Sequence, residues 1–302
     1  MNMYLHNPLL NTVPIPNSPR FVSTRPICGN RQCSGSLLDR LKDRRRPIFE
    51  GRWGCSAKCL RVMVEEKIRR EPIEDPTDRE QHRHRMPLGL IMLTQGWITR
   101  EQLQAALVAQ RQAGTGRIGA WLAAECGLTE GDIARALGLQ WRCPVLTAHG
   151  FDPGRMALSA PMILLERLGM VPLRLSGRRN LYVGFEETPD QAACFALERV
   201  NGLTVQGGLL EGGQLREARE RFRASQFIES TVEEVYDAET ISERIALELR
   251  RIQPRASCLV RIHQYYWLRM WLEAGAMTNQ DGGLPAHRAD VLDCVYTVGR
   301  TQ

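Results

Sequence analysis

The feature that most constrains this chain is an internal repeat. Residues 87–110 (PLGLIMLTQGWITREQLQAALVAQ) align with residues 117–140 (RIGAWLAAECGLTEGDIARALGLQ) at a constant offset of 30. The offset brings apolar residues onto apolar residues, threonine onto threonine and glutamine onto glutamine. A repeat of this size is one supersecondary unit that buries its apolar side against its neighbour. The sequence therefore predicts two similar units in direct contact.

Each copy of the repeat predicts two short helices joined by a tight turn. Thr99 and Gln102 have the spacing of a capping box at a helix start, and Thr129 repeats it in the second copy. The turns before these boxes contain Gly96 and Gly127. On each second helix, spacings of four and three place two apolar residues and a glutamine on one face: Leu103, Leu107 and Gln110, then Ile133, Leu137 and Gln140. The matched glutamines suit either a ligand contact or an ordinary polar helix end.

This tandem pattern resembles the N-terminal domain of type II secretion protein E and related pilus-assembly ATPases. The resemblance continues through the predicted strands 170–175 and 181–185 and a predicted helix that begins at 188 and ends at Val200. It covers residues 86–225 and does not reach the cysteine-rich segment or the C-terminal residues. It implies the fold of that domain, without the ATPase domain.

Some members of that family bind cyclic di-GMP through the two blocks. The resemblance implies a ligand-binding set: Leu88, Gly89, Gly96, Leu103, Leu107, Gln110, Arg117, Ile118, Gly119, Leu137 and Gln140. In the family, the arginine that begins each block contacts the nucleotide, and a guanidinium suits both phosphate and guanine. Arg117 occupies that position in the second block. The first block has Pro87 there, and Arg85 is the candidate substitute. Cys126 also departs from the family pattern, which has glycine at that position.

Four of the nine cysteines predict a zinc site. Cys28 and Cys33 are separated by four residues, and Cys55 and Cys59 by three. Two such pairs can close a tetrahedral site, because each short loop places two sulfurs on one side of the ion. An odd number of cysteines without an export signal argues against a disulfide framework. The alternative is four free thiols.

The segment between and after the cysteine pairs supports a finger. Residues 48–53 predict a short strand, Gly54 a turn, and residues 56–71 an amphipathic helix whose start lies between the second pair. This order resembles a treble-clef zinc finger. Nearby, Arg44, Arg45 and Arg46 could contact phosphate or form a solvated loop, and the second reading is preferred. His82 and His84 are expected to be solvent-exposed rather than metal ligands.

Charge and missing motifs limit the function classes. Residues 1–85 contain 17 basic and 10 acidic residues, a net charge of +7, whereas the remaining 23 and 24 give −1. None of the three lysines, Lys42, Lys58 and Lys67, follows a glycine, so the chain has no P-loop. Signatures of common hydrolases, zinc proteases and dinucleotide-binding enzymes are also missing. The sequence therefore predicts a protein that is not an enzyme.

The C-terminal residues predict a helix at 240–252 and a hairpin of residues 257–262 and 267–273. The hairpin contains clustered tyrosine and tryptophan residues, which could form a partner-binding surface, stack on bases or cover a small core. The core reading is preferred. In the predicted second strand, Leu268, Met270 and Leu272 face one side, and Trp267, Arg269 and Trp271 the other.

The predicted fold class is α+β. The predicted divisions are a disordered arm (1–26), a zinc finger (27–71), a charged linker (72–85), the duplicated helical motif (86–145), an α/β subdomain (146–225) and an α/β extension (226–302). No apolar run reaches the ~20 residues of a membrane span, so we expect a cytoplasmic protein without membrane insertion.

The function expected from sequence is that of a non-catalytic adaptor or sensor. It would connect a partner protein of a secretion, pilus or cell-envelope machine with cyclic di-GMP. The alternative is a nucleic-acid-binding protein that uses the finger and the basic residues 44–46, with an affinity that falls steeply with salt.

Overall fold

The computed structural model describes residues 27–33, 47–71, 85–177, 179–272 and 283–298. The predicted arm (1–26), residues 72–84 of the predicted linker, the arginines 44–46 and the two linker histidines lie outside these ranges. Helices and strands are mixed along the chain, which confirms the α+β class. Within the described ranges, the apolar helices are too short to cross a bilayer.

The elements of the chain are as follows: β1 (Ile48–Phe49), β2 (Arg52–Trp53), α1 (Ala57–Arg70), α3 (Leu88–Thr94), α4 (Arg100–Ala113), α5 (Ile118–Cys126), α6 (Glu130–Trp141), α7 (Pro153–Met156), α8 (Met162–Arg167), β3 (Val171–Ser176), β4 (Asn180–Phe185), α9 (Gln191–Asn201), β5 (Thr204–Leu209), α10 (Gly212–Arg223), β6 (Ser230–Val235), α11 (Ala238–Ile252), β7 (Ala256–Ile262), β8 (Tyr265–Trp271), a 3-10 helix (Arg288–Asp290) and β9 (Val291–Val298).

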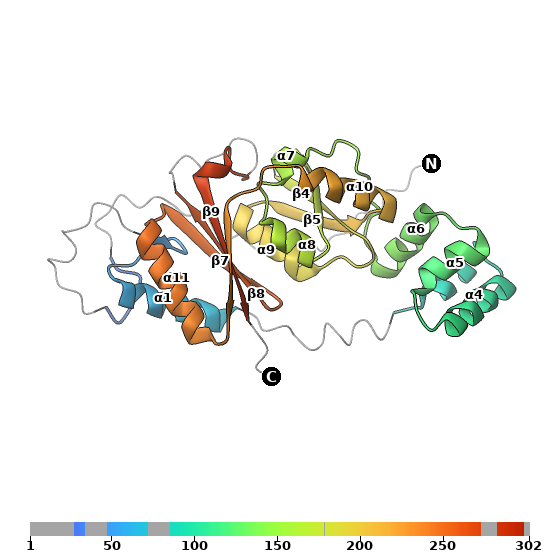
Figure 1. Cartoon of the computed structure of the whole chain (residues 1–302), viewed down its shortest axis with the longest axis horizontal. Coiled ribbons are helices and arrows are strands. Elements are labelled where there is room, and N and C mark those ends of the chain that lie inside the picture. Colours follow the sequence, from blue (N-terminus) through green and yellow to red (C-terminus); the bar gives the residue numbers. More distant parts are fainter. Residues whose placement is uncertain (1–26, 34–46, 72–84, 178, 273–282, 299–302) are drawn as a thin grey trace, which may run out of the picture.

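The repeat forms a four-helix bundle at one end of the elongated molecule (Figure 1). Both predicted capping boxes are present, at Thr99 and Thr129. Gly96 and Gly127 adopt left-handed φ angles of 71° and 66° in the two turns, a conformation that glycine adopts without a steric penalty. The local prediction of two helical hairpins is therefore confirmed.

Residues that are 30 positions apart in the two copies occupy the centre of the bundle core. Ala106 on α4 and Ala136 on α6 are both fully buried. Leu103, Ile133 and Leu137 share the same cluster, as predicted, whereas Leu107 is half-buried and does not belong to it. The most buried core position of α4 and of α6 is thus an alanine. Helices that approach closely at this point leave room only for a small side chain.

The α/β subdomain follows the bundle. Its three-stranded sheet has the order β3-β4-β5, with β3 antiparallel to β4 and β4 parallel to β5. Helix α9 makes the crossover between the two parallel strands, as such a connection requires. Asp152 begins the short helix α7, because its side chain accepts a hydrogen bond from the Arg155 backbone N–H and caps the helix.

A second sheet, with the strand order β6-β9-β8-β7, lies between the α/β subdomain and the helices α1 and α11, and is called the central sheet (Figure 1). The predicted hairpin is β7 and β8. Every residue of β8 is buried. Trp267 and Trp271 pack into the core of the α/β subdomain, while Leu268 and Met270 pack against α1 and α11. The aromatic cluster therefore belongs to the core, and the partner-surface and base-stacking readings are wrong.

The cysteine-rich segment packs onto this central sheet. The predicted single strand at 48–53 is in fact a hairpin of two short strands, since Glu50 and Gly51 form the turn with φ angles of 49° and 72°. Helix α1 lies beside α11 on one face of the sheet (Figure 1). Leu60 and Val64 of α1 share a core with Ile245 of α11. Residues 47–71 and the C-terminal extension therefore share one core.

Candidate functional site

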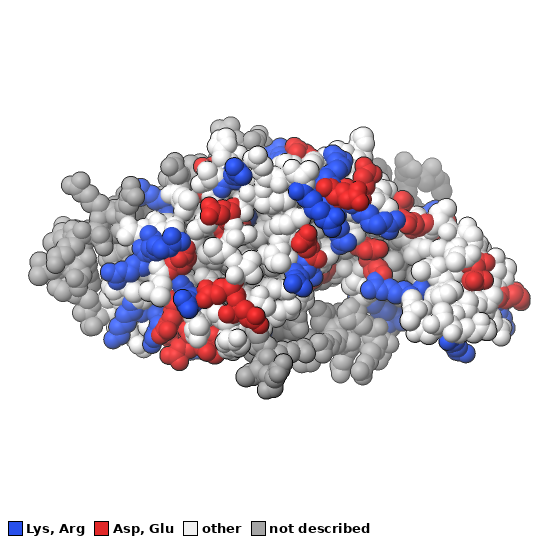
Figure 2. Space-filling view, viewed as in Figure 1, with Lys and Arg blue, Asp and Glu red and all other residues white. Residues whose placement is uncertain are grey.

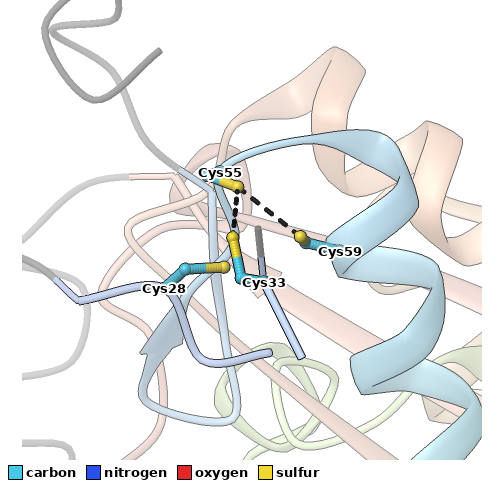
Figure 3. Close-up of side chains that lie close together, drawn as sticks. All are labelled: Cys28, Cys33, Cys55 and Cys59. Carbon is cyan, nitrogen blue, oxygen red and sulfur yellow. Dashed lines mark hydrogen bonds between the residues drawn. The ribbon is translucent and has the colours of Figure 1, made fainter. Parts of the chain in front are cut away.

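The four predicted ligands lie together. The Sγ atoms of Cys28, Cys33, Cys55 and Cys59 are all within 4.8 Å of one another (Figure 3). The Cys55 sulfur is 3.4 Å from that of Cys33 and 3.5 Å from that of Cys59. Thiolates about 2.3 Å from a tetrahedral zinc ion have sulfurs about 3.8 Å apart. The cluster therefore has the size and the ligand type of a structural zinc site.

Local hydrogen bonds fix the position of each cysteine pair. The Gly29 N–H donates to the Trp53 carbonyl at 2.7 Å and joins the first cysteine loop to the β1–β2 hairpin. The Ser56 side chain caps α1 by accepting from the Cys59 N–H at 3.2 Å. Cys55 and Cys59 therefore flank the first turn of a helix, where unpaired amides and the helix dipole favour thiolate.

The thiols differ in acidity. Burial raises the pKa of Cys59, but hydrogen bonds from Asn30, at 3.3 Å, and Ser56 outweigh it and lower the pKa to about 7. Burial raises the pKa of Cys28 and of Cys55. A divalent cation binds the thiolate form, so metal binding at this cluster would release protons from the more weakly acidic thiols.

The finger also covers the edge strand of the central sheet. The Glu50 N–H donates to the Ser257 carbonyl at 3.1 Å. Further along β7, the Leu259 N–H donates to the Glu50 carboxylate at 2.8 Å and the Arg261 N–H to the Glu71 carboxylate at 3.4 Å. Main-chain and side-chain groups of the finger therefore replace a neighbouring strand.

Two cations hold these carboxylates in place. Lys67 pairs with Glu71, whose side chain is only 4% exposed. Arg199 of α9 reaches Glu71 at 3.2 Å and Glu50 at 3.4 Å. Buried carboxylates require such partners, because removal of a charge from water is costly. The network connects the finger, the central sheet and the α/β subdomain.

In the bundle, the two matched glutamines make equivalent hydrogen bonds: each side-chain amide donates to a backbone carbonyl just before the other copy of the repeat. The Gln110 side-chain amide donates to the Gly116 carbonyl at 3.0 Å, and that of Gln140 donates to the Met86 carbonyl at 2.8 Å. Both donors and both acceptors are related by the offset of 30. Each glutamine therefore fixes the segment that begins the other copy, and the bundle has a pseudo-two-fold arrangement.

An arginine adjoins each of the two carbonyl acceptors: Arg117 follows Gly116, and Arg85 precedes Met86. Arg117 is 73% exposed and pairs with Glu187 of the subdomain. Arg85 donates to the Gln140 carbonyl at 3.3 Å, and its guanidinium carbon is 3.8 Å from the centroid of the Trp141 ring. The candidate substitute for the first-block arginine is thus beside the glutamine of the second block.

Besides Gly96 in the turn and half-buried Leu107, the other residues implied as ligand contacts fall into two groups. Buried or half-buried in the bundle core are Leu88, Leu103, Ile118 and Leu137. Two glycines allow close approach: a Cβ on Gly89 would meet Leu103 at 2.4 Å, and one on Gly119 would meet Ile133 at 3.2 Å. These residues shape the bundle, whereas the glutamines and arginines provide its polar edges.

Several residues of these sites carry contacts that the sequence did not predict. The Arg85 guanidinium stacks on the ring of Trp141. Because Trp141 directly follows the matched Gln140, the sequence could have indicated that it lies at the same edge. Asn30, which hydrogen-bonds the Cys59 sulfur, lies between the first two cysteines. Glu50 and Glu71 gave no local signal, because their partners on β7 are about 200 residues distant in the chain.

Comparisons with known proteins give only structural neighbours. No family model matches the chain, and no curated protein does. A structure of MshE with cyclic di-GMP matches 46% of this chain and 99% of its own, with 25% identity and a TM-score of 0.35. The N-terminal domain of XpsE, in two crystal forms, matches 45% and 43% of this chain and 92% and 90% of its own. Its identities are 17% and 16%, with TM-scores of 0.30 and 0.26. These neighbours are N-terminal domains of ATPases of the type II secretion protein E family.

Proposed function

We propose that this protein is a non-catalytic regulatory adaptor of a secretion, pilus or cell-envelope system. The bundle of residues 86–145 is its sensory domain and binds cyclic di-GMP, and residues 146–302 with the finger form the part that contacts a partner protein. The observation that carries the proposal is the reciprocal bonding of Gln110 and Gln140. Cyclic di-GMP consists of two identical halves, and a pseudo-two-fold bundle offers each half one edge with a matched glutamine.

Each edge supplies a guanidinium and a positioned backbone. Arg117 provides the first, because its exposed side chain can leave Glu187 for a phosphate or a guanine face. Arg85 provides the second, since its stacking on Trp141 holds the guanidinium plane beside Gln140. In this proposal the glutamines are positioning residues: their amides hold the segments from which the arginines project.

The finger holds one structural zinc ion through Cys28, Cys33, Cys55 and Cys59. A complete set of four thiolates leaves no open coordination position for a substrate or a water molecule, which is the arrangement of structural rather than catalytic zinc. Its role here is to keep the β1–β2 hairpin and α1 in the geometry that covers the central sheet.

Replacement of Arg117 with alanine is expected to weaken cyclic di-GMP binding. Loss of a charge-assisted hydrogen bond costs about 1.5–3 kcal/mol, which corresponds to one to two decades in Kd. Isothermal titration calorimetry at low salt measures the change. Arg85→Ala is expected to weaken binding in the same range, because Arg85 supplies the guanidinium beside Gln140.

Arg135→Ala is the matched control, since Arg135 is an exposed bundle arginine on α6 that pairs with Asp132. Its affinity should equal that of the unaltered protein. No heat with the unaltered chain would contradict the sensor proposal, and an unchanged Kd in Arg117→Ala would contradict the assigned role.

A further inference from the structure

We infer that two copies of this chain pair through the outer face of α4, with the two helices antiparallel. This inference goes beyond the proposed function and does not depend on nucleotide binding. It begins from an asymmetry between the two copies of the repeat. On α6, Ala134 is only 3% exposed and Gly138 is buried, because this face packs against the α/β subdomain. A Cβ on Gly138 would lie 3.2 Å from Val145, in the segment that leads into that subdomain.

Polar bonds complete this covered face of α6. Glu130 accepts from the Gly213 N–H at 2.6 Å and from Arg216 at 3.1 Å. Val145 also forms a bridge with Leu209 at the end of β5. One of the two pseudo-equivalent faces of the bundle is therefore occupied by the chain itself.

The equivalent face of α4 is open in the described structure. Thirty residues before Ala134 and Gly138 lie Gln104 and Val108, which are both exposed, Val108 by 44%. In Figure 1, α4 is on the far side of the bundle from the α/β subdomain. A shallow hollow follows this face, and its lining on α4, which we call the α4 stripe, consists of Glu101, Gln104, Ala105, Val108, Ala109 and Gln112.

The α4 stripe has the shape of a helix-packing surface. Its members recur at spacings of three and four and so form one continuous row along the helix. Ala105 and Ala109 are small, which allows a second helix to approach closely beside Val108. The stripe extends over nearly the whole of α4 and has no charged residue in its centre.

The charges of α4 favour a second, antiparallel copy as the occupant. At one end, the carboxylates of Glu101 and of Glu125 on α5 outnumber exposed Arg100, which does not line the hollow. Exposed Arg111 borders the other end. A two-fold axis between Ala105 and Val108 is about 8 Å along the helix from Glu101 and about 7 Å from Arg111, at 1.5 Å per residue. Each glutamate would therefore lie level with the arginine of the other copy, and the helix dipoles would oppose.

This arrangement has further support and a clear symmetry. Glu125 of α5 borders the hollow and adds a second carboxylate near the Glu101 end. A two-fold axis uses the same stripe on both copies, so the contact closes and produces a dimer rather than a fibre. A parallel pair would instead place like charges together.

Sedimentation equilibrium of the full chain tests this inference. We expect the unaltered protein to form dimers at concentrations up to about 200 µM and the dimer to weaken with salt. Val108→Glu should raise the dimer Kd at least about tenfold, because it buries an unpaired carboxylate at the centre of the contact. Glu101→Arg alone should also raise it, and Glu101→Arg combined with Arg111→Glu should return it close to the original value.

Leu247→Glu is the matched control, since Leu247 is also an exposed apolar helix residue, on α11. It should leave the dimer unchanged, and circular dichroism should show that each variant is folded. A monomer at every concentration overturns the inference, as does a dimer that Val108→Glu leaves intact. Failure of the double charge reversal to restore affinity overturns the antiparallel arrangement.

Discussion

Replacement of Cys55 with serine is expected to abolish metal binding and to uncover the edge of the central sheet. The Cys55 sulfur lies centrally in the cluster, 3.4 and 3.5 Å from two of the other sulfurs. The free energy of zinc binding is also folding free energy for such a site, with apparent values of about 10–16 kcal/mol in isolated fingers at pH 7. Loss of the ion should therefore unfold the cysteine loop and the β1–β2 hairpin.

The effect should extend beyond the finger because Glu50 and Glu71 cap the β7 amides. Once the finger loosens, the Leu259 and Arg261 N–H groups lose their acceptors. We expect metal analysis to find one zinc per chain in the original protein and none in Cys55→Ser. Hydrogen exchange should show faster exchange at these two amides in the variant, while amides within the four-helix bundle stay protected.

Cys126→Ser is the matched control, because Cys126 belongs to α5 in the bundle and lies outside the cluster. It should retain the metal and the exchange pattern of β7. Purified protein without any metal, but with Leu259 and Arg261 already protected, would show that the finger covers the edge without zinc.

Asp293→Ala is expected to be the most destabilising single change outside the finger. Asp293 and Arg269 are both fully buried, and they form a bidentate pair with contacts of 2.9 and 2.8 Å. The same carboxylate accepts from the Trp267 indole at 2.8 Å. Without Asp293, the Arg269 guanidinium stays buried with only neutral acceptors, which typically costs about 3–5 kcal/mol.

Urea unfolding followed by circular dichroism measures this loss. The double variant Arg269→Met with Asp293→Leu should recover much of the lost stability, because an apolar pair carries no uncompensated charge. Arg251→Ala is the surface control: Arg251 pairs with Glu248 on α11 and is largely exposed, so its loss should leave the free energy of unfolding close to that of the original protein. A free energy of unfolding for Asp293→Ala within 1 kcal/mol of the original would contradict the account, since a buried charge would then be tolerated without its partner.

The sequence predicted best where structure is decided by neighbouring residues. The capping boxes at Thr99 and Thr129 and the helix start at Ser56 follow from spacings of three residues. The cysteine cluster was also predictable, because each pair is held by its own short loop. The internal repeat also allowed a prediction beyond neighbouring residues, because two copies of one motif imply two similar hairpins in contact.

The sequence predicted poorly where residues distant in the chain determine the structure. The β1–β2 turn at Glu50 is fixed by contacts with β7, and the Glu50 carboxylate and Leu259 are 209 positions apart. Strand β8 is buried on both faces because α1 covers one of them, which no pattern within β8 indicates. The matched glutamines were visible in the repeat, but their bonds to the opposite copy depend on how the copies pack.

The coverage of β7 by the finger has a consequence for how the protein is made. A ribosome that adds about 5–20 residues per second completes β7 about 10–40 s after the glutamate that caps it. During this interval the cysteine loops and the β1–β2 hairpin can form, but the apolar side of α1 has no sheet to pack against. A nascent chain therefore exposes the apolar side of α1 until β7 and the strands that follow it emerge, and chaperones have that interval in which to shield it.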